Sequence, residues 1–478
     1  MPVLTRLRRL GTRQSGAAAL TVALAVMLAA CGQSHPDSIF HHRTDVNRDV
    51  DFLFKLIIWL GTFVFVIVES ILVITLIKFR QRPGQPEPKH VHGNTTLEIT
   101  WTVVPLLVLI VIAIPTIRTI FKTQATAVAD ALQVEVIGHQ WWWEFRYPQY
   151  TTREASGRVD TVVTANELYL PIGKTVNFTL HSHDVIHSFW VPALSGKRDV
   201  VTNHTNYLWY TPDSSGVGVW NGACVEYCGT SHGNMRFKAF TVTQADFDSW
   251  IAHQEQMATV LTPAPGTSGV TPGGATALAT NVAGSQAAGA NTGPGVVAPP
   301  PGGAPARQSS TQAANASGAG VPNAPGAVNA QVAQAGFIAY PRDKLPAYTI
   351  PQTPFPAGLR YNDALLASGN AAAGEKLVTN GICIACHTVH GEKNMAGIVG
   401  PNLTHLAIRT TIAAGLYPND AQHLARWVKD APAMKQGVIM PALGLGEYDP
   451  VNLKGPVTAG GFTDQQIADI VAYLQTLK

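Results

Sequence analysis

Two long apolar stretches constrain the fold of this 478-residue chain more than any other feature. They run from about Phe52 to Phe79 and from about Ile99 to Phe121. A helix needs about 20 apolar residues to cross a bilayer, and both stretches are long enough. The chain carries four basic residues at or between their facing ends: Lys78, Arg80, Arg82 and Lys89. Basic loops tend to stay in the cytoplasm, so the sequence predicts a membrane hairpin (within residues 31–125) whose two ends face the periplasm.

The first 30 residues have the composition of an export signal. Arginines at positions 6, 8, 9 and 13 precede an apolar run that ends in Leu28-Ala29-Ala30-Cys31-Gly32. A basic region, a short apolar core and small residues form the pattern of a signal peptide. The ending resembles a bacterial lipobox, so we expect residues 1–30 to be removed and Cys31 to be acylated. The alternative is an uncleaved signal anchor with an inert thiol.

The loop from Cys224 to Met235 gathers two thiols, a carboxylate, an imidazole and a thioether. Such soft ligands favour copper over calcium, magnesium or manganese. A second imidazole must come from elsewhere, and we expect His187, which begins the sequence His-Ser-Phe-Trp-Val-Pro. His181 and His183 lack that context and are predicted to be strand or rim residues. The alternatives are a disulfide between the two cysteines and a Cys2His2 zinc site, although zinc sites rarely recruit methionine.

A second cluster, Cys383-Ile384-Ala385-Cys386-His387, has the C-x-x-C-H pattern of covalent c-type haem attachment. All five cysteines of the chain therefore fall in recognisable motifs, and none is left for a structural disulfide. A methionine downstream should be the sixth iron ligand. We expect Met440, which precedes Pro441; Met434 is the alternative, and Met395 follows the haem-attachment motif too closely.

The sequence pattern and composition of the chain change twice after the apolar stretches. Residues 126–255 contain segments of alternating polarity that predict an all-β sandwich. Residues 256–340 form an Ala/Gly/Pro-rich linker, in which Arg307 is the only charge up to residue 335. Such a segment cannot bury enough apolar surface to offset the conformational entropy that it would lose on folding. We therefore expect a disordered tether with a reach of roughly 50 Å. In residues 360–478, Thr463 can cap a terminal helix with apolar residues at helical spacing.

Together, H-S-F-W-V-P and C-x-E-x-C-x-x-x-H-x-x-M resemble the binuclear copper A site of cytochrome c oxidase subunit II. The C-x-x-C-H motif, the following Gly400-Pro401-Asn402-Leu403 and the Met-Pro pair resemble a class I cytochrome c. The chain is therefore similar to subunit II of a caa-type haem-copper oxidase. The resemblance implies a multidomain membrane protein with a two-helix transmembrane hairpin, an all-β cupredoxin domain, the disordered linker and an all-α cytochrome c domain.

The resemblance also implies roles for individual residues. The copper A ligands would be His187, Cys224, Glu226 (through its carbonyl), Cys228, His232 and Met235. The haem c residues would be Cys383, Cys386, His387 and Met440, with the carbonyl of Pro401 orienting the histidine. The side chain of Glu226 would also face a magnesium or manganese ion shared with subunit I.

Five further residues near the predicted strands and spans invite interpretation. In the family, electrons enter at the position of Trp141 and protons enter near Glu98; for Trp142 and Trp143 we expect a packing role on both faces of an edge strand. Glu69 lies inside the first span and has no matching family role, so we expect a polar contact with a neighbouring helix.

The implied function is electron transfer in the bacterial inner membrane. Electrons would pass from cytochrome c or another donor to haem c, then to copper A, then to haem in subunit I, where oxygen is reduced and protons are translocated. A subunit III partner is expected as well. The alternatives are the small subunit of a copper A nitric oxide reductase and a free lipoprotein electron shuttle. The net charge of +3 is too small to suggest nucleic acid binding.

Overall fold

The computed structural model describes residues 37–80, 82–85, 92–124, 130–153, 157, 159–214, 216–258 and 336–478, together with Val22. Cys31, the rest of the predicted signal and residues 259–335 of the predicted linker lie outside the described residues. The chain divides into two compact units, Met1–Lys122 with Val191–Gly196, and Thr123–Trp190 with Lys197–Lys478.

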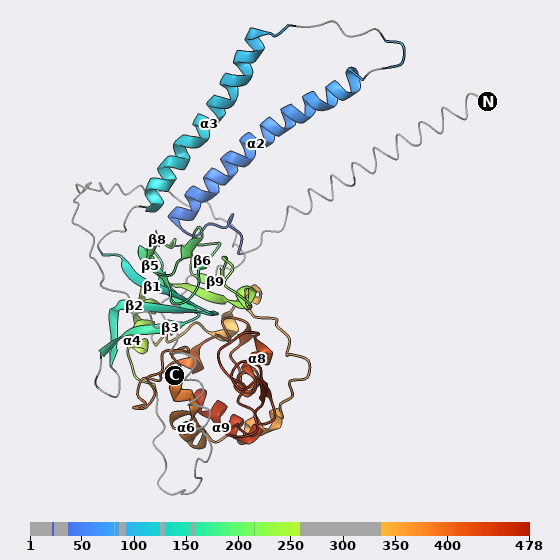
Figure 1. Ribbon diagram of the computed structural model, residues 1–478. Helices are drawn as coiled ribbons and strands as arrows, with labels where there is room; N and C mark the ends of the chain where they lie inside the picture. Colours follow the sequence, from blue (N-terminus) through green and yellow to red (C-terminus); the bar gives the residue numbers. More distant parts are fainter. Residues whose placement is uncertain are drawn as a thin grey trace. The chain divides into compact units, whose positions relative to one another are not determined.

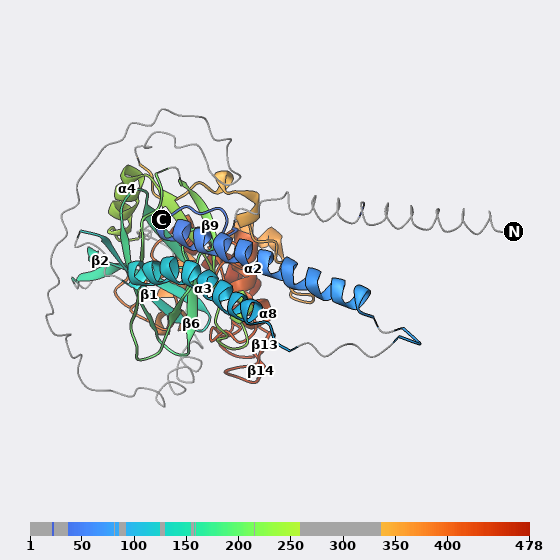
Figure 2. The same cartoon turned by 90° about the horizontal axis from the view of Figure 1, so that it is seen from above.

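The first unit is built on two long apolar helices, α2 (Asp45–Lys78) and α3 (Thr95–Gln124). Both are long and apolar enough to cross a membrane, and their apolar side chains are exposed. The two views show them as neighbouring helices (Figures 1 and 2). The Lys122 ammonium lies 2.7 Å from the Asp49 carboxylate, which joins the last turn of α3 to the first turns of α2. The expected two-helix hairpin is confirmed.

The helix α2 begins about two turns before the predicted apolar stretch. Thr44 caps it by accepting a hydrogen bond from the Asn47 N–H at 3.0 Å. The Asn47 side chain donates to the Pro192 carbonyl at 2.9 Å, and the Arg43 N–H donates to the Ala193 carbonyl at 2.9 Å. The polar first turns are therefore anchored to the segment Val191–Gly196 of the same unit.

The second unit contains a sandwich of two five-stranded sheets, ordered β3-β2-β1-β5-β8 and β4-β10-β9-β6-β7 (Figure 1). The strands are β1 (Leu132–His139), β2 (Trp142–Arg153), β3 (Val159–Ala165), β4 (Glu167–Pro171), β5 (Val176–Ser182), β6 (His187–Trp190), β7 (Arg198–Val200), β8 (Asn206–Tyr210), β9 (Gly218–Cys224) and β10 (Arg236–Val242). Helix α4 (Gln244–Gln254) follows, with Thr243 as its cap. The expected all-β sandwich is confirmed.

An aromatic core holds the two sheets together. Alternate residues of β5 are buried, as expected of a strand with one face in a core. The Phe189 ring stacks on the Phe237 ring at 5.0 Å, and Trp143 meets both rings edge-on at 5.7 Å. Large buried rings contribute strongly to a core of this kind. Phe189 lies on β6, which carries His187, and Phe237 lies on β10, which pairs with β9, the strand that carries Cys224.

The C-terminal part of the second unit is helical. Its helices are α6 (Ala371–Thr379), α7 (Ala421–Lys429), α8 (Ala431–Met434) and α9 (Asp464–Leu474), accompanied by the short hairpins β11–β12 (Thr411–Ile412 and Tyr417–Pro418) and β13–β14 (Tyr448–Asp449 and Gly455–Pro456). Thr463 caps α9 in a capping box with Gln466. At Gly374 a Cβ would lie 1.9 Å from the Asp469 carbonyl oxygen, so only glycine allows α6 to pack this closely on α9.

The segment that enters the helical part, residues 336–350, runs along both parts of the second unit. The Tyr340 N–H donates to the Tyr169 hydroxyl at 3.1 Å, and the Tyr348 hydroxyl donates to the Val219 carbonyl at 2.7 Å. The Arg342 guanidinium donates to the carbonyl oxygens of Asn419 and Ala407, both at 2.7 Å. This segment therefore holds the sandwich and the helical part together.

Candidate redox centres

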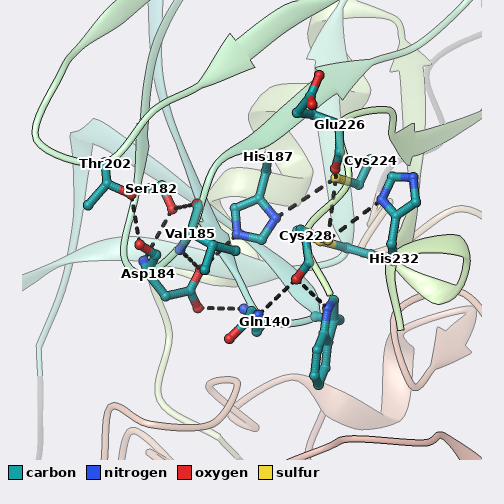
Figure 3. Close-up of polar contacts among 12 residues, drawn as sticks. Gln140, Ser182, Asp184, Val185, His187, Thr202, Cys224, Glu226, Cys228 and His232 are labelled. Atoms are coloured by element: carbon teal, nitrogen blue, oxygen red, sulfur yellow. Dashed lines mark hydrogen bonds and ion pairs between the residues drawn. The ribbon is translucent and has the colours of Figure 1, made fainter. Parts of the chain in front are cut away.

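The predicted cysteine loop brings its soft ligands together at one end of β9. The Cys224 and Cys228 sulfurs lie 3.8 Å apart and both are free thiols. The His187 Nδ1 lies 3.8 Å from the Cys224 sulfur, and the His232 Nδ1 lies 3.6 Å from the Cys228 sulfur. The two imidazoles approach the sulfur pair from opposite sides (Figure 3). The alternative of a disulfide is wrong for this pair.

Two further donors complete the cluster. The Met235 sulfur lies 3.8 Å from the Cys228 sulfur, and the Glu226 carbonyl oxygen lies 3.2 Å from the Cys224 sulfur. The Glu226 carboxylate itself is exposed. Within the described residues, His187, Cys224 and Cys228 form a group whose ligand atoms all lie within 4.8 Å of one another. Four of these donors are buried and His232 is half-buried. A set of two thiols, two imidazoles and a thioether fits copper by its softness.

The two thiols differ in how readily they lose a proton. A hydrogen bond from the Cys228 thiol lowers the pKa of Cys224, although burial opposes this, and the His187 ring adds to the lowering. The same hydrogen bond raises the pKa of Cys228. The first proton of the pair is therefore lost more readily from Cys224 than from Cys228. A metal ion that binds both thiolates would displace both protons.

Asp184 orients His187, a role that the sequence did not predict. Its carboxylate accepts a hydrogen bond from the His187 Nε2 at 2.8 Å and another from the Gln140 N–H at 2.6 Å. Burial raises the pKa of Asp184, but these hydrogen bonds outweigh burial, so the pKa is lowered. Carboxylates that orient ligand imidazoles in this way are common behind metal sites. Asp184 therefore keeps Nδ1 of His187 facing the sulfurs.

Trp141 contacts the cysteine loop directly. Its indole N–H donates to the Cys228 carbonyl at 2.9 Å, and the Gln140 amide donates to the same oxygen at 2.8 Å. Trp143 is buried in the sandwich core, as expected, whereas Trp142 stacks on the His139 ring at 4.2 Å. The expectation that Trp142 and Trp143 lie on an edge strand is wrong, because their strand β2 lies between β3 and β1.

The rival histidines lie away from the sulfur pair, as predicted. His181 is on β5, and the His183 ring stacks against the His139 ring at 5.0 Å. His139 in turn lies 3.2 Å from the buried Glu144 carboxylate. These residues form a polar cluster of their own.

The C-x-x-C-H motif lies on a short 3-10 helix, η5 (Ile382–Ala385), and the turn after it. The His387 Nδ1–H donates to the Pro401 carbonyl at 2.8 Å, as the family pattern predicts. Burial lowers the pKa of His387, which keeps the imidazole neutral and able to bind iron through Nε2. A Cβ at Gly400 would lie 2.6 Å from this ring, so glycine is needed beside it.

A large apolar cavity opens beside this motif. Both cysteines and the histidine line it, and Met440 is the one methionine among its lining residues. Met434 and Met395 instead pack in the hydrophobic core of the helical part. Further lining residues are Val399, Leu403, Leu406, Ile412, Leu424, Trp427, Val428, Val438 and Leu443. An apolar cavity with two thiols, an imidazole and a thioether at its walls fits a covalently attached haem.

One wall of the same cavity belongs to the sandwich. Gln140, Trp141, Trp142, Ala165 and Asn166 all line it. On the helical side, Gly437 approaches so closely that a Cβ there would lie 2.8 Å from the Trp141 ring. Trp141 therefore borders the haem-type cavity with its ring and holds the cysteine loop through its N–H.

The membrane unit holds the two carboxylates singled out in the sequence. Glu98 lies in the first turn of α3, and Glu69 lies inside α2; both side chains are exposed in the chain alone.

Comparisons with known proteins agree with all three parts of the chain. Residues 132–242 match the periplasmic domain of cytochrome C oxidase subunit II, residues 42–119 match the transmembrane domain of that subunit, and residues 371–478 match cytochrome c.

Individual proteins that are similar to this chain are also named as subunit 2 of cytochrome c oxidase. Cytochrome c oxidase subunit 2 of Alkalihalophilus pseudofirmus is 42% identical over 192 residues, which are 39% of this chain and 53% of that protein. Probable cytochrome c oxidase subunit 2 of Rickettsia bellii is 33% identical over 229 residues, 45% of this chain and 81% of that protein. The chain thus spans about half the length of the first relative. The solved periplasmic domain of subunit II of cytochrome oxidase of Bradyrhizobium japonicum is 27% identical, with a TM-score of 0.23 over 27% of this chain and 97% of that one.

Proposed function

The chain belongs to the cytochrome c oxidase subunit II family, and on that basis we propose that it passes electrons from its own haem c to a binuclear copper A centre. From there the electrons would reach haem in a subunit I partner, where oxygen is reduced and protons are translocated. The observation that carries the proposal is the position of Trp141, which borders the cavity of the C-x-x-C-H motif and donates to the Cys228 carbonyl.

We assign the copper ligands to the six residues of the sulfur cluster: His187, Cys224, Glu226, Cys228, His232 and Met235. When bound, the copper pair would supply a one-electron centre. The chain contributes the shape of the site: β9 and η1 (His232–Asn234) hold one imidazole and the sulfurs, and β6 holds the other imidazole. Asp184 fixes the orientation of His187, so few groups need to move when the charge changes.

We propose that Cys383 and Cys386 would hold a haem covalently and that His387 and Met440 would bind its iron. Nδ1 of His387 is held by the Pro401 carbonyl, which leaves Nε2 free for iron. Met440 is supported over Met434 because it lines the cavity, whereas the Met434 side chain packs in the core.

The remaining roles follow from the family. Glu98 would take up protons at the cytoplasmic mouth of α3, and the exposed Glu226 carboxylate would share a magnesium or manganese ion with subunit I. A soluble cytochrome c or another donor would reduce the haem, and a subunit III would complete the complex. The spans would lie in the bacterial inner membrane, with residues 126–255 and 360–478 on the periplasmic side and Cys31 acylated.

The proposal can be tested in the purified membrane complex by comparing His187→Asn with His204→Asn. His204 is an exposed histidine of the same sandwich and serves as the matched control. With reduced cytochrome c as donor, His187→Asn should take up haem electrons but lose oxygen uptake, and His204→Asn should retain it. Oxygen uptake at the wild-type rate by His187→Asn would refute the copper route. Consumption of nitric oxide without oxygen uptake by the wild-type complex would instead identify a nitric oxide reductase.

A further inference from the structure

The sandwich and the helical part each contribute one buried charged side chain that forms hydrogen bonds to the other part. Lys435 follows α8 in the helical part and is 3% exposed. Its ammonium donates to the Trp141 carbonyl of the sandwich at 2.6 Å and to the Ala413 carbonyl at 3.3 Å. Hydrogen bonds from a charged donor are among the stronger ones in proteins.

The reciprocal charge is Glu167, at the start of β4 in the sandwich and 4% exposed. Its Oε1 accepts two hydrogen bonds from Thr410 of the helical part, one from the N–H and one from the hydroxyl, both at 2.6 Å. Thr410 follows Arg409, which lines the haem-type cavity and whose positive charge acts on Glu167. Each charge is therefore satisfied mainly by groups of the other part.

These two buried charged side chains fix the position of the helical part on the sandwich. Burying a charge is costly unless hydrogen bonds replace those it made to water. If the helical part slid or rotated on the sandwich, Lys435 would lose the Trp141 carbonyl and Glu167 would lose both bonds from Thr410. The Ser231 hydroxyl, which donates to the Gln436 carbonyl, adds a third contact beside Lys435.

The two charges also have opposite effects on the two centres. Lys435 lies at the turn between β1 and β2 that carries Trp141, on the side of the cysteine loop, and the Cys228 sulfur acts on its charge. A positive charge there favours an added electron at the copper centre. Glu167 lies on the Arg409 side of the haem-type cavity, where a negative charge favours loss of an electron.

The protonation of both groups depends on their partners. Burial lowers the pKa of Lys435 to about 7, and the neighbouring Cys228 sulfur opposes that change. Burial raises the pKa of Glu167, and the bonds from Thr410 together with the Arg409 charge oppose it.

We propose that Lys435 and Glu167 are positioning residues that lock the haem c domain onto Trp141 and bias electron flow toward the copper loop. The inference rests on the proposed function. One electron leaves the haem iron, which is oxidised, and arrives at the copper pair, which is reduced; no proton or third reactant is needed. This fixed contact places Trp141 between the two centres. The two charges make electron transfer from haem to copper more favourable than it would be if the two domains were separated.

The test uses the full chain loaded with both cofactors, as Lys435→Met, Lys435→Arg and Glu167→Gln. Lys393→Met, an exposed lysine of the helical part, controls for the change in net charge. Reduction potentials of the haem and the copper centre are measured separately by spectroelectrochemistry. Transfer from haem to copper is measured by stopped-flow absorbance.

Lys435→Met should lower the copper potential and slow transfer about tenfold, the effect of losing one charged hydrogen bond from the docked state. Lys435→Arg should keep the copper potential near the wild-type value, because its charge remains. Glu167→Gln should raise the haem potential while the haem spectrum stays unchanged. Slower transfer without a shift of either potential would indicate a purely structural role and would overturn the proposed bias of electron flow.

Wild-type potentials and a wild-type rate in both Lys435→Met and Glu167→Gln would overturn the inference. If Lys435→Met fails to fold, Lys435→Arg with a shifted copper potential would overturn it independently. Failure of the proposed function looks different: the wild-type chain itself would then show no transfer between haem and copper.

Discussion

Replacing Asp184 with asparagine should weaken copper binding without removing any copper ligand. The Asp184 carboxylate accepts from the His187 Nε2 at 2.8 Å, from the Gln140 N–H at 2.6 Å and from the Val185 N–H at 2.6 Å. Asparagine has nearly the same shape but carries an NH2 group in place of one acceptor. The amide oxygen can still accept from His187 and Val185, but the NH2 group then faces the Gln140 N–H. The turn at Gln140 loses its bond, and the His187 ring is held by an uncharged and therefore weaker acceptor.

Loss of a partner that orients a ligand histidine typically costs about 10- to 100-fold in metal affinity. That range corresponds to about 1.4–2.7 kcal/mol of binding free energy. The assay is a competition titration of copper(I) against a chelator, using the metal-free full chain. Asp199→Asn, which removes an exposed carboxylate on the neighbouring strand β7, is the matched control and should leave the affinity unchanged. An affinity for Asp184→Asn within twofold of wild type would refute the argument that Asp184 supports His187.

Two further predictions concern the helical part. Met440→Ala should abolish the weak far-red absorption band of sulfur-ligated oxidised haem, whereas Met434→Ala should retain it and lower thermal stability, since Met434 packs in the core; the opposite pattern would make Met434 the ligand. Burial lowers the pKa of His405 to about 4, so its unfolded form binds more protons and stability should fall as the pH drops from 6.5 to 4, by about 3 kcal/mol. His405→Phe should lose this pH dependence in chemical unfolding measured at several pH values; an unchanged pH profile would contradict the assignment.

Local patterns were sufficient to predict several elements of this fold. The apolar stretches predicted α2 and α3, although Thr44 begins α2 earlier than the apolar residues do. The alternation in β5 and the Thr463 cap of α9 are equally local signals. Such patterns depend on residues within a few positions of one another, which is why they can be recognised in a sequence.

The contacts that join the two redox parts could not be predicted in this way. Thr410 and Glu167 are 243 positions apart, and Lys435 and Trp141 are 294 apart. No periodicity connects residues at such separations, and the composition of the predicted linker suggested a tether rather than a fixed partner. Asp184 was also missed, although it lies three positions before His187; a carboxylate at that spacing from a ligand histidine is the signal that could have found it.

The most direct test of the account is to follow one electron through the loaded full chain. After rapid reduction of the haem, absorbance at the haem and copper bands should change together, as the haem is oxidised and the copper centre is reduced. The account predicts a single first-order rate that does not change with protein concentration, because the haem cavity and the cysteine loop share Trp141. A rate proportional to protein concentration, or reduction of copper without oxidation of the haem, would contradict it.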